Sequence, residues 1–205
     1  MVFLDQVQRD GSRVTPAPVA LLTGFAPFRH WAVNSSGAAA RMLSAARPAL
    51  AARILPVDHR EAGAALDAAL AAVSPDIALL TGLADEPCLR LERAARRPVH
   101  EGGAEDGDAA ALHGVWPWAA ALDAIRATGA PARLSQDAGR YVCETVYWRG
   151  LSAPRRPRLV AFLHVPPIGP DWPAARIAAA VGACLDAALG ADQNASSPAK
   201  SIASK

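Results

Sequence analysis

Residues 158–165 read RLVAFLHV, an apolar run in which only Arg158 and His164 carry polar side chains. Two similar runs are residues 19–24 (VALLTG) and 76–82 (DIALLTG). Short runs that are apolar almost throughout are typical of strands buried on both faces of a parallel sheet. The three runs therefore predict central strands of such a sheet.

Helical stretches alternate with these runs. A helix predicted after residue 35 can be capped by Ser35 or Ser36. Residues 83–114, which hold Gly102, Gly103 and Gly114, are expected to be irregular. Strands that alternate with helices imply an α/β fold, here a single-domain, three-layer sandwich whose mainly parallel twisted sheet carries helices on both faces. The remaining predicted strands cover residues 53–57 and 132–135, and the predicted helices cover residues 36–46, 59–73, 118–128, 142–151 and 171–189.

The two ends of the chain differ in composition from the part between them. Residues 1–17 mix charges with glycine and prolines, and residues 190–205 are small and polar. Neither end can bury enough apolar surface to offset its ordering entropy. We therefore expect a folded domain over 18–189 with a loose N-terminal segment and a disordered tail.

Charge and cysteine content narrow the class of protein. The net charge of +2 argues against a nucleic-acid binder, and the cluster of Arg93, Arg96 and Arg97 is typical of a solvated face. Three cysteines form no paired framework, which favours a reducing compartment. The start of the chain lacks the pattern of a signal peptide, and no apolar run approaches the roughly 20 residues of a membrane span. These features predict a cytoplasmic protein that binds neither nucleic acid nor membrane.

Ligands of open α/β sheets bind outside the carboxyl ends of the strands, and that rule selects candidate residues. Phe25 and Leu83 follow the glycines that end two predicted strands, and His164 lies near the end of a third. A turn at residues 138–143 (AGRYVC) opens a predicted helix beside Cys143. A catalytic or binding site is therefore expected at this edge.

Cys143 is the candidate nucleophile. A thiol at a helix N-terminus feels the positive end of the dipole, which favours the thiolate, and free N–H groups there can hold an oxyanion. The alternative is an inert buried cysteine, which suits Cys88 and Cys184 better.

His164 is the candidate base, although a lone histidine at a strand end is more often structural. A cysteine and a histidine distant in sequence but convergent in space form a nucleophile–base pair. A carboxylate on the far ring nitrogen would orient the histidine. Glu92 can serve, but the residues alone do not select it from the other acidic side chains, and a glutamate beside arginines is usually a surface ion-pair member.

Four segments of the chain resemble pyroglutamyl peptidase I. They occur in the order of that family and together span about residues 19–189. The matching segments are residues 23–28 (TGFAPF) with Val33 and Asn34, residues 82–84 (GLA) with Glu92 and Arg93, residues 138–143 (AGRYVC), and residues 162–166 (FLHVP).

The resemblance implies a Cys–His–Glu triad of Cys143, His164 and Glu92. It also implies hydrolysis of the N-terminal pyroglutamyl residue of a blocked peptide through a thioacyl intermediate, without metal or cofactor, and a homo-oligomer is compatible with it. Phe25 and Phe28 are then expected to line a compact apolar pocket for the lactam ring. Leu83 and Val142, from a strand end and the nucleophile turn, complete the predicted substrate-binding set.

The chain departs from the family pattern in the loops around the predicted site. Arg29 and His30 replace a glycine pair, the loop at 85–88 (DEPC) is one residue shorter, and Arg97 replaces an asparagine. A long arm shrinks to residues 98–103. These departures bear on specificity more than on the chemistry.

Glu144 replaces an asparagine next to Cys143. If its side chain points into the site, its charge opposes thiolate formation. If it faces solvent, with Arg140 or Arg149 as its candidate partner, water screens that effect.

Two other functions remain open on the sequence alone. One is a catalytically weak or silent homologue that binds a small lactam or a peptide N-terminus. The other is an enzyme similar to purine phosphorylases, which would need a basic phosphate site near a glycine-rich turn. The sequence offers no convincing turn of that kind, and retention of all three triad residues argues against the silent homologue.

Overall fold

The computed structural model describes residues 17–103 and 110–196, and its centre is a six-stranded sheet. The strand order is β2-β1-β3-β8-β4-β7, and a separate antiparallel pair is formed by β5 and β6. All neighbouring strands of the main sheet are parallel except β4 and β8. The strands are β1 (Ala20–Phe25), β2 (Ala51–Leu55), β3 (Ile77–Leu83), β4 (Leu89–Glu92), β5 (Ala94–Arg96), β6 (Ala111–His113), β7 (Ala132–Ser135) and β8 (Leu159–Val165).

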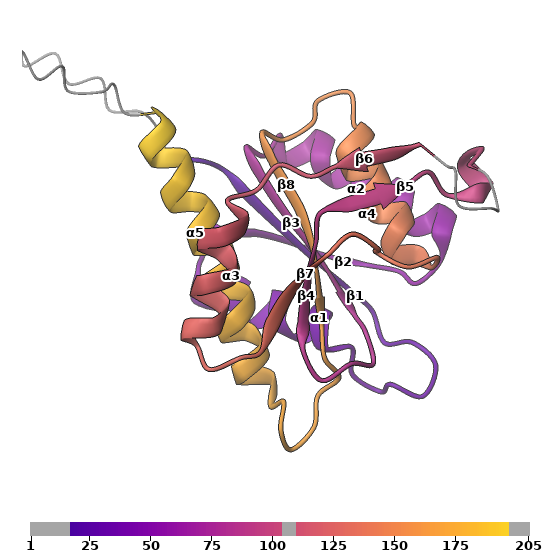
Figure 1. The fold of residues 1–205 in the computed structure, drawn as a ribbon. Helices are drawn as coiled ribbons and strands as arrows, with labels where there is room; N and C mark the ends of the chain where they lie inside the picture. Colours follow the sequence, from indigo (N-terminus) through magenta and orange to yellow (C-terminus); the bar gives the residue numbers. More distant parts are fainter. Residues whose placement is uncertain (1–16, 104–109, 197–205) are drawn as a thin grey trace, which may run out of the picture.

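Helices cover both faces of this sheet (Figure 1). One face carries α1 (Ser35–Ala46), α3 (Trp118–Ala127) and α5 (Ala174–Ser196). The other carries α2 (His59–Val73) and α4 (Val142–Ser152), with the β5–β6 pair beside them. Each helical layer buries its own apolar cluster against the sheet. The predicted α/β three-layer sandwich is confirmed.

Local capping explains where two of the helices begin. Asn34 precedes α1, and its Oδ1 accepts a hydrogen bond from the N–H of Ser36 at 3.1 Å. Asp58 precedes α2, and its Oδ1 accepts from the N–H of Glu61 at 2.9 Å. Such bonds satisfy N–H groups that the first turn of a helix leaves free. The cap of α1 is thus Asn34, not Ser35 or Ser36 as predicted.

Residues 83–114 are not irregular as predicted, because they contain β4, β5, β6 and the 3₁₀ turn η1 (Val99–Glu101). In β4, the sequence LRLE alternates, with Leu89 and Leu91 in the apolar core and Arg90 and Glu92 on the opposite face. Alternation of apolar and polar residues indicates a strand. This segment has only four residues, two of them charged, so the alternating pattern was too short to be recognised. The segment therefore supplies a central strand.

The other predicted strands and helices are all present, with boundaries that differ by at most two residues except in α5. Helix α5 begins at Ala174 and continues to Ser196. Residues 190–196 are therefore helical, and the tail predicted to begin at residue 190 is corrected to this extent. The remaining tail residues, 197–205, and residues 1–16 lie outside the described ranges.

By length and composition alone, residues 174–193 of α5 could cross a membrane, which the search for long apolar runs overlooked. Ile177, Val181 and Leu185 of this helix are fully buried and belong to the core against the sheet. Many alanines raise the hydropathy of the helix and also let it pack closely. In this fold α5 is a core helix.

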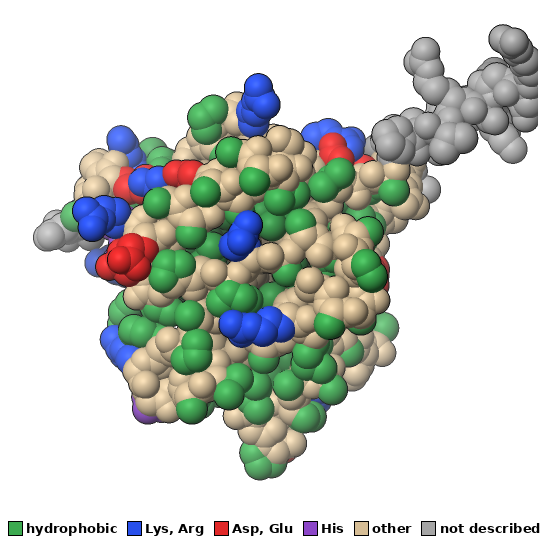
Figure 2. Space-filling model, turned by 180° about the vertical axis from the view of Figure 1, so that it is seen from behind, with side chains coloured by type: hydrophobic (Ala, Val, Ile, Leu, Met, Phe, Trp, Pro, Cys, Tyr) green, Lys and Arg blue, Asp and Glu red, His purple; other side chains and the backbone are tan. Residues whose placement is uncertain are grey.

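The arginines that follow Glu92 do not act as one basic patch. The guanidinium of Arg93 lies 5.9 Å from the ring centroid of Trp118, and Arg96 pairs with Asp137 at 3.4 Å. On the face drawn in Figure 2, the described arginine side chains are scattered, some of them beside acidic groups. This distribution differs from the concentrated basic face of a nucleic-acid binder.

Candidate active site

Cys143 lies in the first turn of α4, whose N-cap is Tyr141. Before the helix, Gly139 adopts a left-handed φ of 85°, and its N–H donates to Asp137 Oδ1 at 3.0 Å. Glycine adopts this conformation without steric cost, so the chain can turn sharply into the helix. The turn places Cys143 at the helix start, as predicted from the sequence, and the structure shows that its side chain is partly exposed.

A glycine in β3 makes room for the thiol. A Cβ atom at Gly82 would lie 2.8 Å from Cys143 Sγ and 2.9 Å from Phe162 Cζ. Real Cβ atoms do not approach so closely, so any side chain at this position would displace the thiol or the ring. Gly82 is thus required by the close approach of α4 to the sheet.

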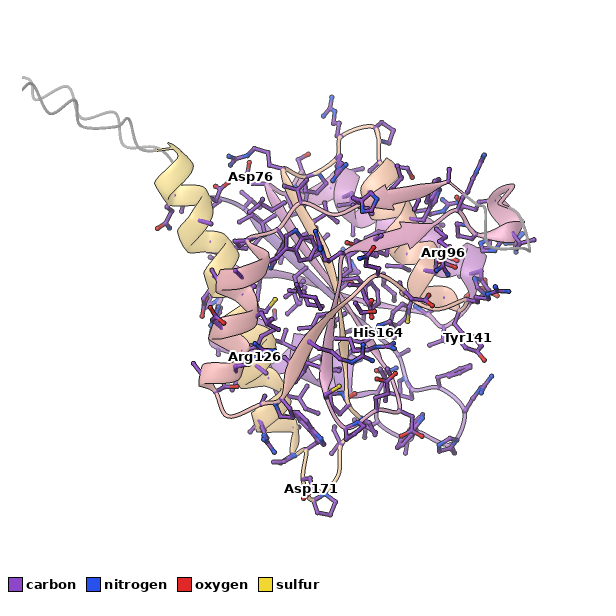
Figure 3. The ribbon with its side chains drawn as sticks, viewed as in Figure 1. Asp76, Arg96, Arg126, Tyr141, His164 and Asp171 are labelled. Carbon is purple, nitrogen blue, oxygen red and sulfur yellow. The ribbon has the colours of Figure 1, made fainter. Side chains whose placement is uncertain are left out.

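Glu92 and His164 are hydrogen-bonded across the antiparallel β4–β8 pair. His164 Nδ1–H donates to Glu92 Oε1 at 2.9 Å, and the carboxylate is fully buried. Because Nδ1 carries the proton in this arrangement, the neutral ring keeps the lone pair of Nε2 free to accept a proton. Figure 3 shows His164 near the middle of the molecule, close to the sheet.

The protonation of His164 reflects its two neighbours. Burial by itself lowers its pKa, but hydrogen bonds with Cys143 and Glu92 outweigh burial and raise the pKa to about 9. The imidazolium form is therefore favoured while the thiol and the carboxylate are in place. Cys143, His164 and Glu92, from three separate elements, are thus brought together at one place, with His164 hydrogen-bonded to Glu92 and close to Cys143.

The backbone around Glu92 is held by α4. Tyr147 of α4 donates its hydroxyl to the backbone oxygen of Glu92 at 2.9 Å, and burial raises the pKa of Tyr147. Glu92 Oε2 is buried and has no hydrogen-bond partner among the described residues. Glu92 is thus fixed in position by bonds from β8 and α4.

Cys143 and His164 open into a cavity of about 620 Å³. Phe25, Phe28, Leu83 and Val142, the predicted substrate-binding residues, all line this cavity. Phe25 is 2% exposed and also packs in the core, whereas Phe28 is 39% exposed at the surface. Phe25 therefore lies both at the cavity and in the apolar core. Other lining residues, which sequence reasoning missed, are Trp31, Asn34, Val57, Asp58, His59, Asp85, Arg90, Ala138 and Tyr141.

The rim of the cavity carries Arg29 in an unusual conformation. Its φ is 54°, in the left-handed region that favours glycine, and its guanidinium lies 4.9 Å from the ring of Phe28 and 5.9 Å from that of Tyr141. Tyr141 is 67% exposed, and Figure 3 draws it out at the surface. The conformation agrees with the glycine expected here by resemblance, and the side chain adds a cation between two rings.

Glu144 follows neither of the two expectations. Its side chain is buried, and Oε1 accepts a hydrogen bond from the N–H of Arg96 in β5 at 3.2 Å. Burial raises the pKa of Glu144, and the bond from Arg96 opposes part of that effect. The carboxylate therefore anchors β5 to α4, and pairs with neither Arg140 nor Arg149.

The arrangement suits acyl transfer to sulfur. A thiol at a helix N-terminus, a histidine that can take its proton, and a carboxylate behind the histidine are the parts of a nucleophilic triad. Within the described residues, no group of three His, Cys, Asp or Glu side chains is placed to hold a metal ion.

Comparisons with known proteins identify the family of this chain. The family model for pyroglutamyl peptidase matches residues 19–195. A pyrrolidone-carboxylate peptidase of Clavibacter michiganensis is 36% identical over 183 residues, covering 78% of this chain and 86% of that protein. One of Chromobacterium violaceum is 38% identical over 166 residues, covering 71% and 76%. Both confirm the resemblance seen in the sequence.

Solved structures give the same result. The crystal structure of pyroglutamyl peptidase I from Bacillus amyloliquefaciens superposes with a TM-score of 0.72 at 25% identity, covering 84% of this chain and 97% of that one. Pyrrolidone carboxyl peptidase from Thermococcus litoralis has a TM-score of 0.75 at 23% identity, covering 87% and 96%, and supports the fold alone.

Proposed function

Because this chain belongs to the pyroglutamyl peptidase family, we propose that it removes N-terminal pyroglutamyl residues from peptides through Cys143, His164 and Glu92. The family consists of cysteine-type omega peptidases that act on peptides. The observation that carries the proposal is His164, which is hydrogen-bonded to Glu92 at 2.9 Å and lines the same cavity as Cys143, whose sulfur lies near enough to raise the pKa of the ring.

Acylation begins with the proton of the thiol. His164 Nε2 takes this proton, and the thiolate attacks the carbonyl carbon of the pyroglutamyl residue. The N–H groups at the start of α4 can hold the negative oxygen that forms. The C–N bond then breaks, His164 gives its proton to the leaving amine, and a thioester remains on Cys143.

Deacylation repeats the proton transfers with water. His164 takes a proton from water, the oxygen attacks the thioester carbon, and the sulfur leaves and takes the proton back. Pyroglutamate and the free thiol result. Throughout, Glu92 holds the ring so that Nε2 faces the sulfur, and it stabilises the imidazolium form.

The cavity suits a neutral lactam. Phe25, Phe28 and Val142 supply an apolar wall, and a pyroglutamyl residue carries no charged amine. An ordinary free N-terminus would have to bring an ammonium group against that wall, and losing its hydration costs free energy. Selection for a blocked N-terminus is therefore expected.

The test is hydrolysis of L-pyroglutamyl-p-nitroanilide, with L-prolyl-p-nitroanilide as control because it has the same ring without the lactam carbonyl. We expect release of p-nitroaniline from the first compound only. Wild-type protein that binds L-pyroglutamate with no turnover would instead favour the silent homologue. Rapid alkylation of Cys143 by iodoacetamide near neutral pH, absent in a His164→Ala variant, would report the activated thiol without any substrate.

A further inference from the structure

A row of alternating charges leads from the base of the triad to the surface. Glu92 Oε1 lies 3.3 Å from Arg90 Nε, Arg90 Nη1 lies 2.7 Å from Glu86 Oε1, and Glu86 Oε2 lies 3.0 Å from Arg133 Nη2. The exposed fraction of these side chains rises along the row from 0% to 17%, 36% and 52%. The row therefore extends from the fully buried carboxylate of Glu92, through Arg90, to side chains that are exposed to solvent.

The pairing of β4 with β8 puts Arg90 next to His164. The two residues are directly opposite in the antiparallel ladder, and Arg90 shares the face of β4 that carries Glu92. Arg90 Nη2 lies 3.3 Å from His164 Nδ1. Because Nδ1–H donates to Glu92, it has no lone pair left for Arg90, so this approach is a contact between a permanent cation and the ring rather than a hydrogen bond.

The charge of Glu92 needs more than His164 to balance it. Its carboxylate is fully buried, and one of its oxygens has no hydrogen-bond partner among the described residues. In the proposed reaction, His164 alternates between imidazolium and neutral imidazole. Whenever the ring is neutral, a buried carboxylate with no other counter-charge would be strongly disfavoured. Arg90 supplies a positive charge that does not depend on the state of His164.

The same cation acts on His164 in the opposite sense to Glu92. A positive charge close to the ring disfavours the imidazolium, whereas the carboxylate favours it. An intermediate affinity of His164 for its proton suits a group that must both take a proton from sulfur and release it to the leaving amine.

We propose that Arg90 is a positioning residue that shares the Glu92 carboxylate with His164, balancing its buried charge and limiting how firmly His164 holds its proton. The proposal rests on the proposed peptidase function for its kinetic readout. The other charged or titratable groups near the ring come from α4 and its N-cap, from β4 and its preceding loop, and from the remaining walls of the cavity. They are Cys143, Tyr141, Tyr147, Glu92, Asp85, Glu86, Asp58, His59, Arg29 and His30.

The test compares Arg90→Met with Arg90→Lys and with Arg133→Met, a control at the outer end of the row. Profiles of kcat and KM against pH are measured with L-pyroglutamyl-p-nitroanilide. Arg90→Met is expected to move the basic limb of kcat/KM up by about one pH unit and to lower kcat at neutral pH about tenfold, with KM within about twofold. Arg90→Lys should restore most of the wild-type position of the basic limb, and the pH profile of Arg133→Met should match that of wild type.

A second variant shifts the limb the other way without removing the cation. Glu86→Gln frees Arg90 from its outer partner, so the basic limb should move down by a few tenths of a unit, since Glu86 is partly exposed and screened. This arm keeps the test decisive if Arg90→Met fails to fold.

Nuclear magnetic resonance titration of the ¹⁵N-labelled His164 ring reads the same effect in the absence of substrate. If wild type cleaves no pyroglutamyl substrate, the proposed function fails while this titration still tests Arg90. A loss of kcat in Arg90→Met with an unmoved limb and an unmoved ring titration would mean that Arg90 only supports the fold. That result would overturn the proposal.

Discussion

The two faces of the sheet are formed by the same strands, but they hold polar groups in different environments. On the face covered by α1, α3 and α5, Cys184 of α5 is buried among apolar neighbours, and this burial raises the pKa of its thiol to about 12. On the face covered by α2 and α4, Cys143 lies at a helix start beside His164 and a cavity. The position of a cysteine along its helix, together with its neighbours, thus decides whether its thiol is inert or can react.

Strand alternation produces this difference. In β8, Leu163 and Val165 belong to the first face, whereas Phe162 and His164 point to the second. In β4, Leu91 and Glu92 divide in the same way. A shift of one residue in either strand would move the polar groups into the apolar layer, so the register is strongly specified.

The largest contrast is expected between the two cysteines. Cys143→Ser should lower kcat/KM for a pyroglutamyl substrate on the order of 10⁴-fold or more, because the hydroxyl is a far weaker nucleophile next to this base. Cys184→Ala should keep most of the activity and lose only stability. Steady-state kinetics and thermal unfolding of both variants check this, and an active Cys143→Ser enzyme would remove the thiol from the mechanism.

The next effect concerns the carboxylate behind the histidine. Glu92→Gln should lower kcat by about 10²–10⁴-fold, since an amide neither orients the required tautomer nor stabilises the imidazolium. Because the bond from Glu92 raises the pKa of His164, the basic limb of wild type should lie near pH 9 and should move to lower pH in the variant. Rates across pH 5–10 measure it. A wild-type profile in Glu92→Gln would mean that Glu92 does not act on His164.

A smaller effect separates the two phenylalanines of the cavity. Phe28→Ala should raise KM about five- to tenfold with little change in unfolding free energy, because the side chain is partly exposed. Phe25→Ala should raise KM and also cost about 3–5 kcal/mol of stability, because the ring is buried in the core. Kinetics with denaturant titrations resolve the two quantities. Equal stability losses would contradict the division between rim and core.

The smallest effect is expected at Glu144. Glu144→Gln keeps an oxygen for the N–H of Arg96, so kcat/KM should change less than about twofold. Burial raises the pKa of this carboxyl, so the folded state binds its proton more tightly than the unfolded state. The contribution of Glu144 to the stability of wild type should therefore fall as the pH rises through that raised pKa. The free energy of unfolding of the variant should then increase relative to that of wild type between pH 4 and 7. Denaturant unfolding at both values measures this, and a constant difference would place the carboxylate in water.

Much of the fold and part of the site follow from local sequence. The run at 158–165 predicts its strand because continuous apolar residues need burial on both sides. The placement of Cys143 at a helix start depends on a glycine turn and a helical segment that lie next to each other in the chain. Short-range physics governs both, so both could be predicted with boundaries close to those observed.

Other features needed the tertiary structure. Glu92 could not be chosen from its own surroundings, because its partner lies 72 residues away and the short strand β4 runs antiparallel to β8. The direction of Glu144 was also open, since adjacency to Cys143 does not determine which way a side chain turns at a helix start. Arg90 went unnoticed for the same reason as Glu92.

The sequence by itself determined the α/β class, the positions of the five helices and of the strands outside residues 83–114, and the nucleophile and base as candidates, because each depends on hydrophobic periodicity or on a turn of a few residues. Only the tertiary structure decided how the carboxylate of Glu92 meets His164, which further side chains line the cavity, and how Arg90 enters the site. Those contacts depend on strand order and direction, which arise when distant segments pack together to bury their apolar faces.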